Sequence, residues 1–203
     1  MANSNTAGFG LIPLGVLGSG PANQGQSKYV IQAGYSDSDL FQGCTVRVVA
    51  GYIEQASLTR TLTCLGVFNG IFYNAATTLK PTWSNWYNQP ITPANSENLT
   101  AFILDNPHQL YVGSMSAAAA QAEYGKTYSF SAADPTGSET SGQCTNTLDY
   151  TNRSVNANQW RLIRTAEDPS NNDITAAYTS VVVVNNLNQF GLGTATVGIT
   201  WAS

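Results

Sequence analysis

The chain has 203 residues and a mass of 21.6 kDa, enough for one domain, or for one domain with an arm or a small insert. Charged residues make up only 10% of it, and the net charge is −4. With a net negative charge and few basic residues, the sequence does not predict a basic surface for binding nucleic acid. No apolar run approaches the roughly 18 residues of a membrane span. Residues 1–6 contain no basic or apolar stretch of the secretory kind, so we expect no secretion signal.

Residues 1–27 are predicted to form an extended N-terminal arm, separate from a β-rich core domain at 28–203. Six glycines and two prolines interrupt regular structure in this arm. It nevertheless carries many apolar side chains, seven of which we take as candidate contact residues: Phe9, Leu11, Ile12, Pro13, Leu14, Val16 and Leu17. An arm laid along a partner would bury them. An edge strand packed against the chain's own core would explain them equally well, and the sequence leaves both interpretations open.

From residue 28 the pattern changes to short strands separated by turns. Alternating or β-branched runs predict strands at 29–33, 45–49, 61–68, 71–73, 100–104, 109–112, 159–164, 178–184 and 194–201. The pair Asn69-Gly70 stands between two apolar runs and predicts a hairpin turn. One short helix is expected at 117–124, capped by Ser116 and ended by Gly125. The fold class is therefore mainly all-β, an antiparallel β-barrel or sandwich.

A long segment at 74–98 interrupts the strand pattern. Three prolines make it irregular, yet it holds the aromatic residues Trp83, Trp86 and Tyr87. Loops of this length inside a compact domain often have a function, and aromatic residues in a polar loop suggest a buried plug or a contact surface. The three aromatic residues are candidate contact residues. They are the right types for stacking on sugars, and equally for an aromatic core beneath a polar surface.

The sequence contains no recognisable catalytic, cofactor or metal site. His108 is the only histidine, and neither a nucleophile elbow, a phosphate-binding loop nor a twelve-residue calcium loop is present. Cys44, Cys64 and Cys144 are odd in number and widely spaced, which favours buried free thiols in a protein made in a reducing cytoplasm. We therefore expect no enzymatic activity, no cofactor and no metal.

An ordered series of short motifs resembles a known family. These motifs are 10–15 (GLIPLG), 28–31 (KYVI), 40–43 (LFQG), 46–50 (VRVVA), 65–68 (LGVF), 101–107 (AFILDNP) and 160–163 (WRLI). In this order they resemble the capsid decoration, or cement, proteins of tailed bacteriophages, of the type found in cyanophage-like viruses. The similarity covers most of residues 8–190. The loop at 81–90 is longer and more aromatic than the family pattern, and Asn106 stands where a second acid is common.

The resemblance implies a non-enzymatic structural protein on the exterior of the phage head. Its partners would be the major capsid protein and copies of itself, assembled as a homotrimer, with no role for nucleic acid or membrane. It would clamp neighbouring capsid subunits against the pressure of the packaged DNA, and the mild acidity would keep it away from that DNA. Two other classes of function remain in view. One is a carbohydrate-binding module or receptor-binding head fibre that uses Trp83, Trp86 and Tyr87. The other is a small hydrolase, for which the sequence offers no catalytic set.

Overall fold

The computed structural model describes residues 3–18, 25–56, 62–131 and 136–191. Its strands are β1 (Ile12–Val16), β2 (Ser27–Ile31), β3 (Thr45–Val49), β4 (Tyr52–Gln55), β5 (Gly66–Asn74), β6 (Pro81–Ser84), β7 (Leu99–Leu104), β8 (Gln109–Ser114), β9 (Thr127–Tyr128), β10 (Trp160–Thr165) and β11 (Ser180–Asn185). Two single 3₁₀ turns, η1 (Ala94–Ser96) and η2 (Gln121–Glu123), complete the regular elements of the described residues. The all-β prediction is therefore confirmed. None of the helices in the described ranges is long and apolar enough to span a membrane.

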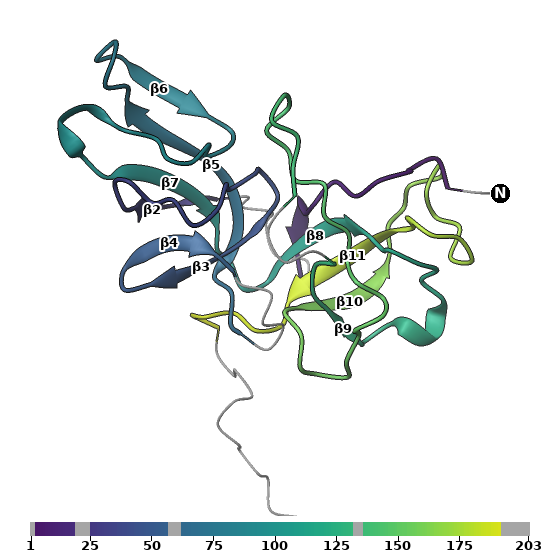
Figure 1. Cartoon of the computed structure of the whole chain (residues 1–203). Coiled ribbons are helices and arrows are strands. Elements are labelled where there is room, and N and C mark those ends of the chain that lie inside the picture. The colour runs from purple at the N-terminus through teal and green to yellow at the C-terminus, as the bar shows by residue number, and fades with distance from the viewer. Residues whose placement is uncertain (1–2, 19–24, 57–61, 132–135, 192–203) are drawn as a thin grey trace, which may run out of the picture.

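The strands form two antiparallel sheets that lie side by side (Figure 1). Sheet A has the order β1-β8-β11-β10-β9, and sheet B has the order β2-β7-β5-β3-β4, with β6 paired to β5. Strands β2 and β4 stand at opposite ends of the sheet B order and nevertheless contact each other. Sheet B is therefore curled toward a closed barrel, which leaves few free strand edges within it.

Two apolar clusters form the interior. Core A lies between sheet A, the loops that follow β8 and the start of β5: Leu11, Ala56, Cys64, Val67, Leu104, Tyr111, Met115, Ala119, Tyr128, Phe130, Leu148, Trp160, Leu162, Val181 and Val183. Core B fills the curled sheet B: Ile31, Leu40, Phe41, Cys44, Val46, Ile53, Leu65, Phe68, Ile71, Tyr87, Leu99, Ala101, Ile103 and Cys144. The sheets are joined across these cores by a hydrogen bond from Trp160 Nε1 to Thr45 Oγ1 of 3.1 Å. A buried bond of this kind fixes the relative position of two otherwise apolar faces.

The predicted arm forms an edge strand over residues 12–16. β1 pairs antiparallel with β8, and Leu11 just before it is 2% exposed within core A. Residues 12–16 thus belong to sheet A rather than to an arm separate from the 28–203 domain. The edge position also tolerates Pro13, which lacks a backbone donor. Of the two interpretations that the sequence left open, the structure therefore shows the edge strand packed against the chain's own core.

Three local predictions were wrong. The chain does not turn at Asn69-Gly70, because β5 runs straight through and β7 pairs with both halves across a bulge between Phe68 and Gly70. The expected helix at 117–124 is only the 3₁₀ turn η2, since so short a segment cannot repay helix nucleation. The segment 74–98 is not wholly irregular, because β6 and η1 lie within it. The strand predicted at 194–201 lies outside the described residues.

Candidate functional site

A cleft opens where the two sheets meet, between β1 and the first half of β5. It has a volume of about 150 Å³. Its floor and walls are Phe9, Leu11, Ile12, Pro13, Gly43, Val67, Phe68 and Leu104, and its polar rim consists of Gln42, Asn69 and Gln143. No lining residue is charged. Four of the seven predicted arm residues therefore line one neutral, largely apolar cleft.

Two glycines allow the chain to approach closely enough to form this cleft. Gly10 has φ +69° and Gly43 has φ +92°, a region that side-chain-bearing residues avoid. A Cβ at Gly10 would lie 2.7 Å from the Cβ of Cys144. The Leu11 amide then donates a hydrogen bond to the Gly43 carbonyl at 3.0 Å. The segment before β1 is thus held against the loop before β3, which places Leu11 inside and leaves Ile12 at the mouth of the cleft.

The seven predicted contact residues divide between the core and the surface. Leu11 is buried, and Phe9, Pro13 and Val16 are half-buried. Ile12, Leu14 and Leu17 are 52%, 44% and 47% exposed. A bulge between Pro13 and Gly15 leaves Leu14 without a partner in β8. Only the last three residues therefore offer large apolar side chains to another molecule.

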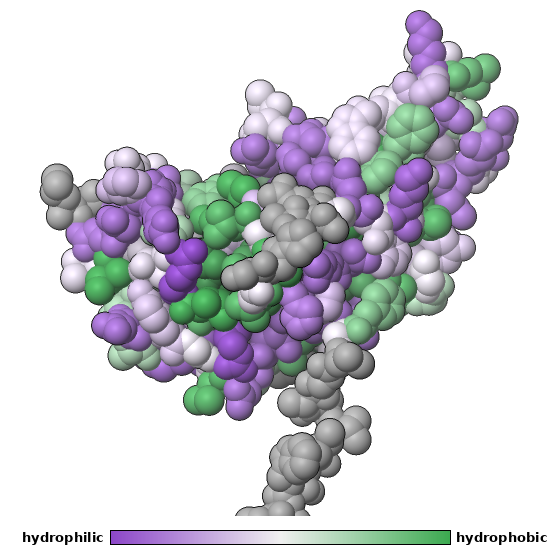
Figure 2. Space-filling model, turned by 180° about the vertical axis from the view of Figure 1, so that it is seen from behind, coloured by the Kyte–Doolittle hydropathy of each residue, from purple (hydrophilic) through white to green (hydrophobic). Residues whose placement is uncertain are grey.

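Ile12 and Leu14 stand at the edge of an apolar layer on the side of sheet A that faces away from core A. Register places Ile12 opposite Val112 and Val112 opposite Val182, while Leu110 lies opposite Val184. None of these belongs to core A or core B, but Val182 and Val184 are buried, and Leu110 and Val112 are half-buried. We call Ile12, Leu14, Leu110 and Val112 the outer apolar face; within it only Ile12 and Leu14 are exposed. Seen from behind, apolar side chains gather over the half of the molecule that carries sheet A (Figure 2).

The aromatic residues of the 74–98 segment have three different environments. Tyr87 is fully buried in core B, where its backbone exchanges two hydrogen bonds with Leu40 of 2.8 and 3.1 Å. Trp86 is half-buried and stacks on Phe41, with ring centroids 5.5 Å apart and an interplanar angle of 6°. Only Trp83 is exposed, at 51%. The three residues therefore do not form one binding surface, and the Tyr87 side chain fills part of the interior of sheet B.

Trp83 instead belongs to an aromatic row that sequence reasoning missed. Phe72 lies directly opposite it in β5 and is 41% exposed, and Phe102 in β7 contacts its ring with centroids 5.0 Å apart. The Trp83 ring covers Gly70, where a Cβ would lie 2.6 Å from ring atom Cζ2. We call Trp83, Phe72 and Phe102 the aromatic row. Strand alternation at 71–73 and 100–104 was the available signal, but only the register of β5, β6 and β7 brings the three together.

The ionisable groups do not assemble a reactive centre among the described residues. Glu123 is 5% exposed, and its carboxylate accepts hydrogen bonds from Lys126 at 2.9 Å and Tyr128 at 2.7 Å, with Arg153 Nε at 3.0 Å. Burial raises the pKa of Glu123, but these donors and the two cations outweigh it, so the pKa lies below the usual value. A carboxylate so fully bonded and so acidic is poorly suited to proton transfer at neutral pH.

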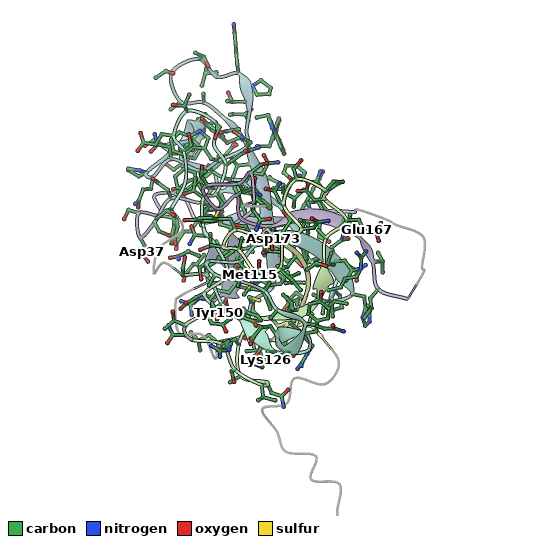
Figure 3. All side chains as sticks on the ribbon, turned by 90° about the vertical axis from the view of Figure 1, so that its right-hand side faces the viewer. Asp37, Met115, Lys126, Tyr150, Glu167 and Asp173 are labelled. Carbon is green, nitrogen blue, oxygen red and sulfur yellow. The ribbon has the colours of Figure 1, made fainter. Side chains whose placement is uncertain are left out.

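Metal-ligating and thiol groups are equally dispersed. Within the ranges that the structure describes, no three His, Cys, Asp or Glu residues gather, and the labelled acids Asp37 and Glu167 lie far apart on the surface (Figure 3). His108 is exposed beside the start of β8. Cys44, Cys64 and Cys144 are buried and free, as the sequence indicated. Burial raises the pKa of the Cys64 and Cys144 thiols to about 12, so neither is a ready nucleophile.

Comparisons with known proteins add no relative. No protein-family model matches the chain, and neither a curated protein nor a solved structure matches it. The functional interpretation therefore depends on the residues of this chain and on their arrangement.

Proposed function

We propose that this protein is a capsid decoration, or cement, protein: a structural virion protein that binds the outer surface of a tailed-phage head. In this role it clamps neighbouring major capsid proteins and assembles as a homotrimer. The ordered motifs at 10–15, 28–31 and 101–107 resemble that family. The structural observation that supports the proposal best is the outer apolar face, with Ile12 and Leu14 held exposed on a rigid sheet.

Exposing large apolar side chains such as Ile12 and Leu14 to water is unfavourable. Isolated apolar residues on a surface are ordinary, but Ile12 and Leu14 are two large, exposed apolar side chains close together at one sheet edge, which favours a contact with another protein. Because the face is part of a hydrogen-bonded sheet, a partner need not order it on binding, and little conformational entropy is lost. A clamp under mechanical load benefits from that rigidity. Low charge also fits a contact that is apolar at its centre, since interface centres are depleted in charged residues.

Binding to phage heads tests the proposal. We expect Leu14→Asp to weaken head binding at least about tenfold, because a carboxylate would be buried in an apolar contact. Leu79→Asp is the matched control, since Leu79 is 70% exposed in the turn between β5 and β6 and lies outside the outer apolar face. Quantitative mass spectrometry of virions should give a copy number in simple ratio to the major capsid protein. Only a few copies per head, or equal binding by both variants, would contradict the proposal.

The aromatic row supports a second candidate function, carbohydrate binding. Trp83 presents an exposed ring that is fixed against Gly70 and flanked by Phe72, an arrangement suited to stacking on the apolar face of a sugar ring. A glycan array with wild-type protein tests it, with Trp83→Ala as the loss-of-binding variant. Phe190→Ala is the control, because Phe190 is 62% exposed and outside the row. An array without signal would reject this candidate and leave the decoration role unaffected.

A further inference from the structure

The aromatic row is part of a wider surface that spans four adjacent strands in the order β6-β5-β7-β2 (Figure 1). Directly opposed residues of paired strands point to the same side of a sheet. Phe72 lies opposite Thr100 in β7, and Thr100 lies opposite Val30 in β2. Phe102 lies opposite Lys28 in β2. We call this surface, which faces away from core B, the sheet B platform: Trp83, Phe72, Phe102, Thr100, Val30 and Lys28.

The sheet B platform carries a cation and no carboxylate. No Asp or Glu occurs in residues 25–31, 66–84 or 99–104, which contain its four strands. Lys28 is exposed, and none of the ion pairs among the described residues includes it. Asp105, just after β7, accepts hydrogen bonds from Ser27 at 3.0 Å and Tyr29 at 2.6 Å, which alternate with Lys28 and lie on the other side of β2. The platform is therefore locally positive in a chain whose net charge is −4.

The other side chains of the platform have the chemistry of a sugar-binding surface. Trp83, Phe72 and Val30 are 51%, 41% and 38% exposed. The Trp83 ring is held over Gly70, so a ligand that stacks on it need not order it first. Thr100 is half-buried between them, and its hydroxyl makes no hydrogen bond with a described residue, so it can donate to or accept from a ligand hydroxyl. Rings and hydroxyls together suit a sugar, which has an apolar face and polar edges.

The spacing of these groups requires a ligand longer than one sugar. Three strand spacings of about 4.8 Å separate β6 from β2, about 14 Å in total. A single sugar ring stacked on Trp83 does not reach Lys28, whereas a chain of sugars that runs across the strands contacts Trp83, Thr100 and Lys28 in turn. A neutral chain makes little use of the ammonium group. An acidic group on the chain gains a charge-assisted hydrogen bond there, without a carboxylate on the platform to repel it.

We propose that the sheet B platform binds an acidic oligosaccharide, with Trp83 stacked on one sugar and the Lys28 ammonium paired with a carboxylate or sulfate group of another. The inference rests on the carbohydrate-binding candidate of the proposed function and adds the charge, the length and the direction of the ligand. It is separate from the decoration role, because Ile12 and Leu14 lie at the edge of sheet A and the platform belongs to sheet B.

A glycan array with neutral, carboxylated and sulfated oligosaccharides of increasing length tests the proposal. We expect binding of the acidic chains, and little binding of single sugars or neutral chains. The carboxylated and sulfated sets distinguish the two sources of negative charge. Raising the salt concentration should weaken the binding of wild type to an acidic chain more than that of Lys28→Gln, because salt screens an exposed ion pair.

Calorimetric titration of variants with the acidic oligosaccharide that binds best on the array provides the second measurement. Lys28→Gln should weaken binding about fivefold, because an exposed ion pair contributes up to about 1 kcal/mol. Trp83→Ala should weaken it at least about tenfold through the lost stacking. Arg164→Gln is the matched control, since it removes the same charge from β10 in sheet A and should leave the affinity unchanged. Urea midpoints close to wild type show that each variant is folded.

The outcomes separate this inference from the proposals on which it builds. Equal affinity for neutral and acidic chains, or wild-type affinity of Lys28→Gln for acidic chains, would overturn the inference and keep the carbohydrate-binding candidate. An array without signal would reject both, and so would adsorption to anionic lipid vesicles without binding of any glycan. Lys28→Gln and Trp83→Ala should bind phage heads as wild type does. Loss of head binding in both would assign the platform to the capsid contact and overturn the inference.

Discussion

Replacing Leu11 and Leu14 separately by alanine distinguishes an integral edge strand from a detached arm. Leu11 is 2% exposed in core A, and its Cδ2 would lie 3.0 Å from a Cβ at Gly113, so the site is tightly packed. Removing a buried leucine side chain costs about 2–5 kcal/mol. We therefore expect Leu11→Ala to lower the free energy of unfolding by about 3 kcal/mol. Leu14 is 44% exposed, and Leu14→Ala should cost no more than about 1 kcal/mol.

Urea denaturation of the two variants beside wild type provides the measurement. Leu11→Ala should lower the midpoint without changing the slope, and should lower Tm by about 6–12 °C for a chain of this length. Leu14→Ala should remain close to wild type in the same assay. Equal and small effects of both substitutions would refute the reasoning, because a segment that gains its burial only from a partner contributes nothing to the free chain.

Three further predictions concern a buried hydrogen bond, a buried carboxylate and the buried thiols. Trp160→Phe should lower the free energy of unfolding in urea by about 1–3 kcal/mol, because Thr45 Oγ1 loses its buried hydrogen-bond partner. The double variant Trp160→Phe/Thr45→Val should lose less free energy of unfolding than the sum of the losses in the two single variants. The lowered pKa of Glu123 stabilises the fold above the unfolded-state pKa of about 4.3, and that stability is lost as pH falls through the folded-state value. The midpoint of wild type should therefore fall more steeply below about pH 4.5 than that of Glu123→Gln, and parallel curves would contradict this assignment. Native protein at pH 8 should leave all three cysteines unmodified by a thiol reagent, whereas the protein in denaturant should react at all three; a fast-reacting thiol in the native state would show that burial does not protect them.

The strand pattern was largely readable from the sequence, because alternation and β-branching act within a few residues. The strand over 45–49 and those over 100–104, 109–112 and 159–164 all recur in the structure, with small shifts at their ends. The run 178–184 recurs as β11, whose residues are all buried. Local sequence was misleading where a distant partner decided the outcome. Asn69-Gly70 has strong turn propensity, yet pairing with β7 and coverage by the Trp83 ring keep β5 extended.

Contacts between distant parts of the chain likewise decided which residues form the candidate site. Sequence identified Ile12 and Leu14, with five other arm residues, as apolar side chains that either a partner or the chain's own core would bury, and it identified Trp83 as an aromatic residue in a polar segment. It could not tell that Leu11 is buried while Ile12 lies at the mouth of a cleft, because that difference follows from contacts with Gly43, Cys144 and Gly113 far along the chain. Composition and periodicity determined the all-β class. The register of β1 on β8, and of β5 between β6 and β7, decided which of the apolar residues face solvent, because facing is set by strand pairing across the fold.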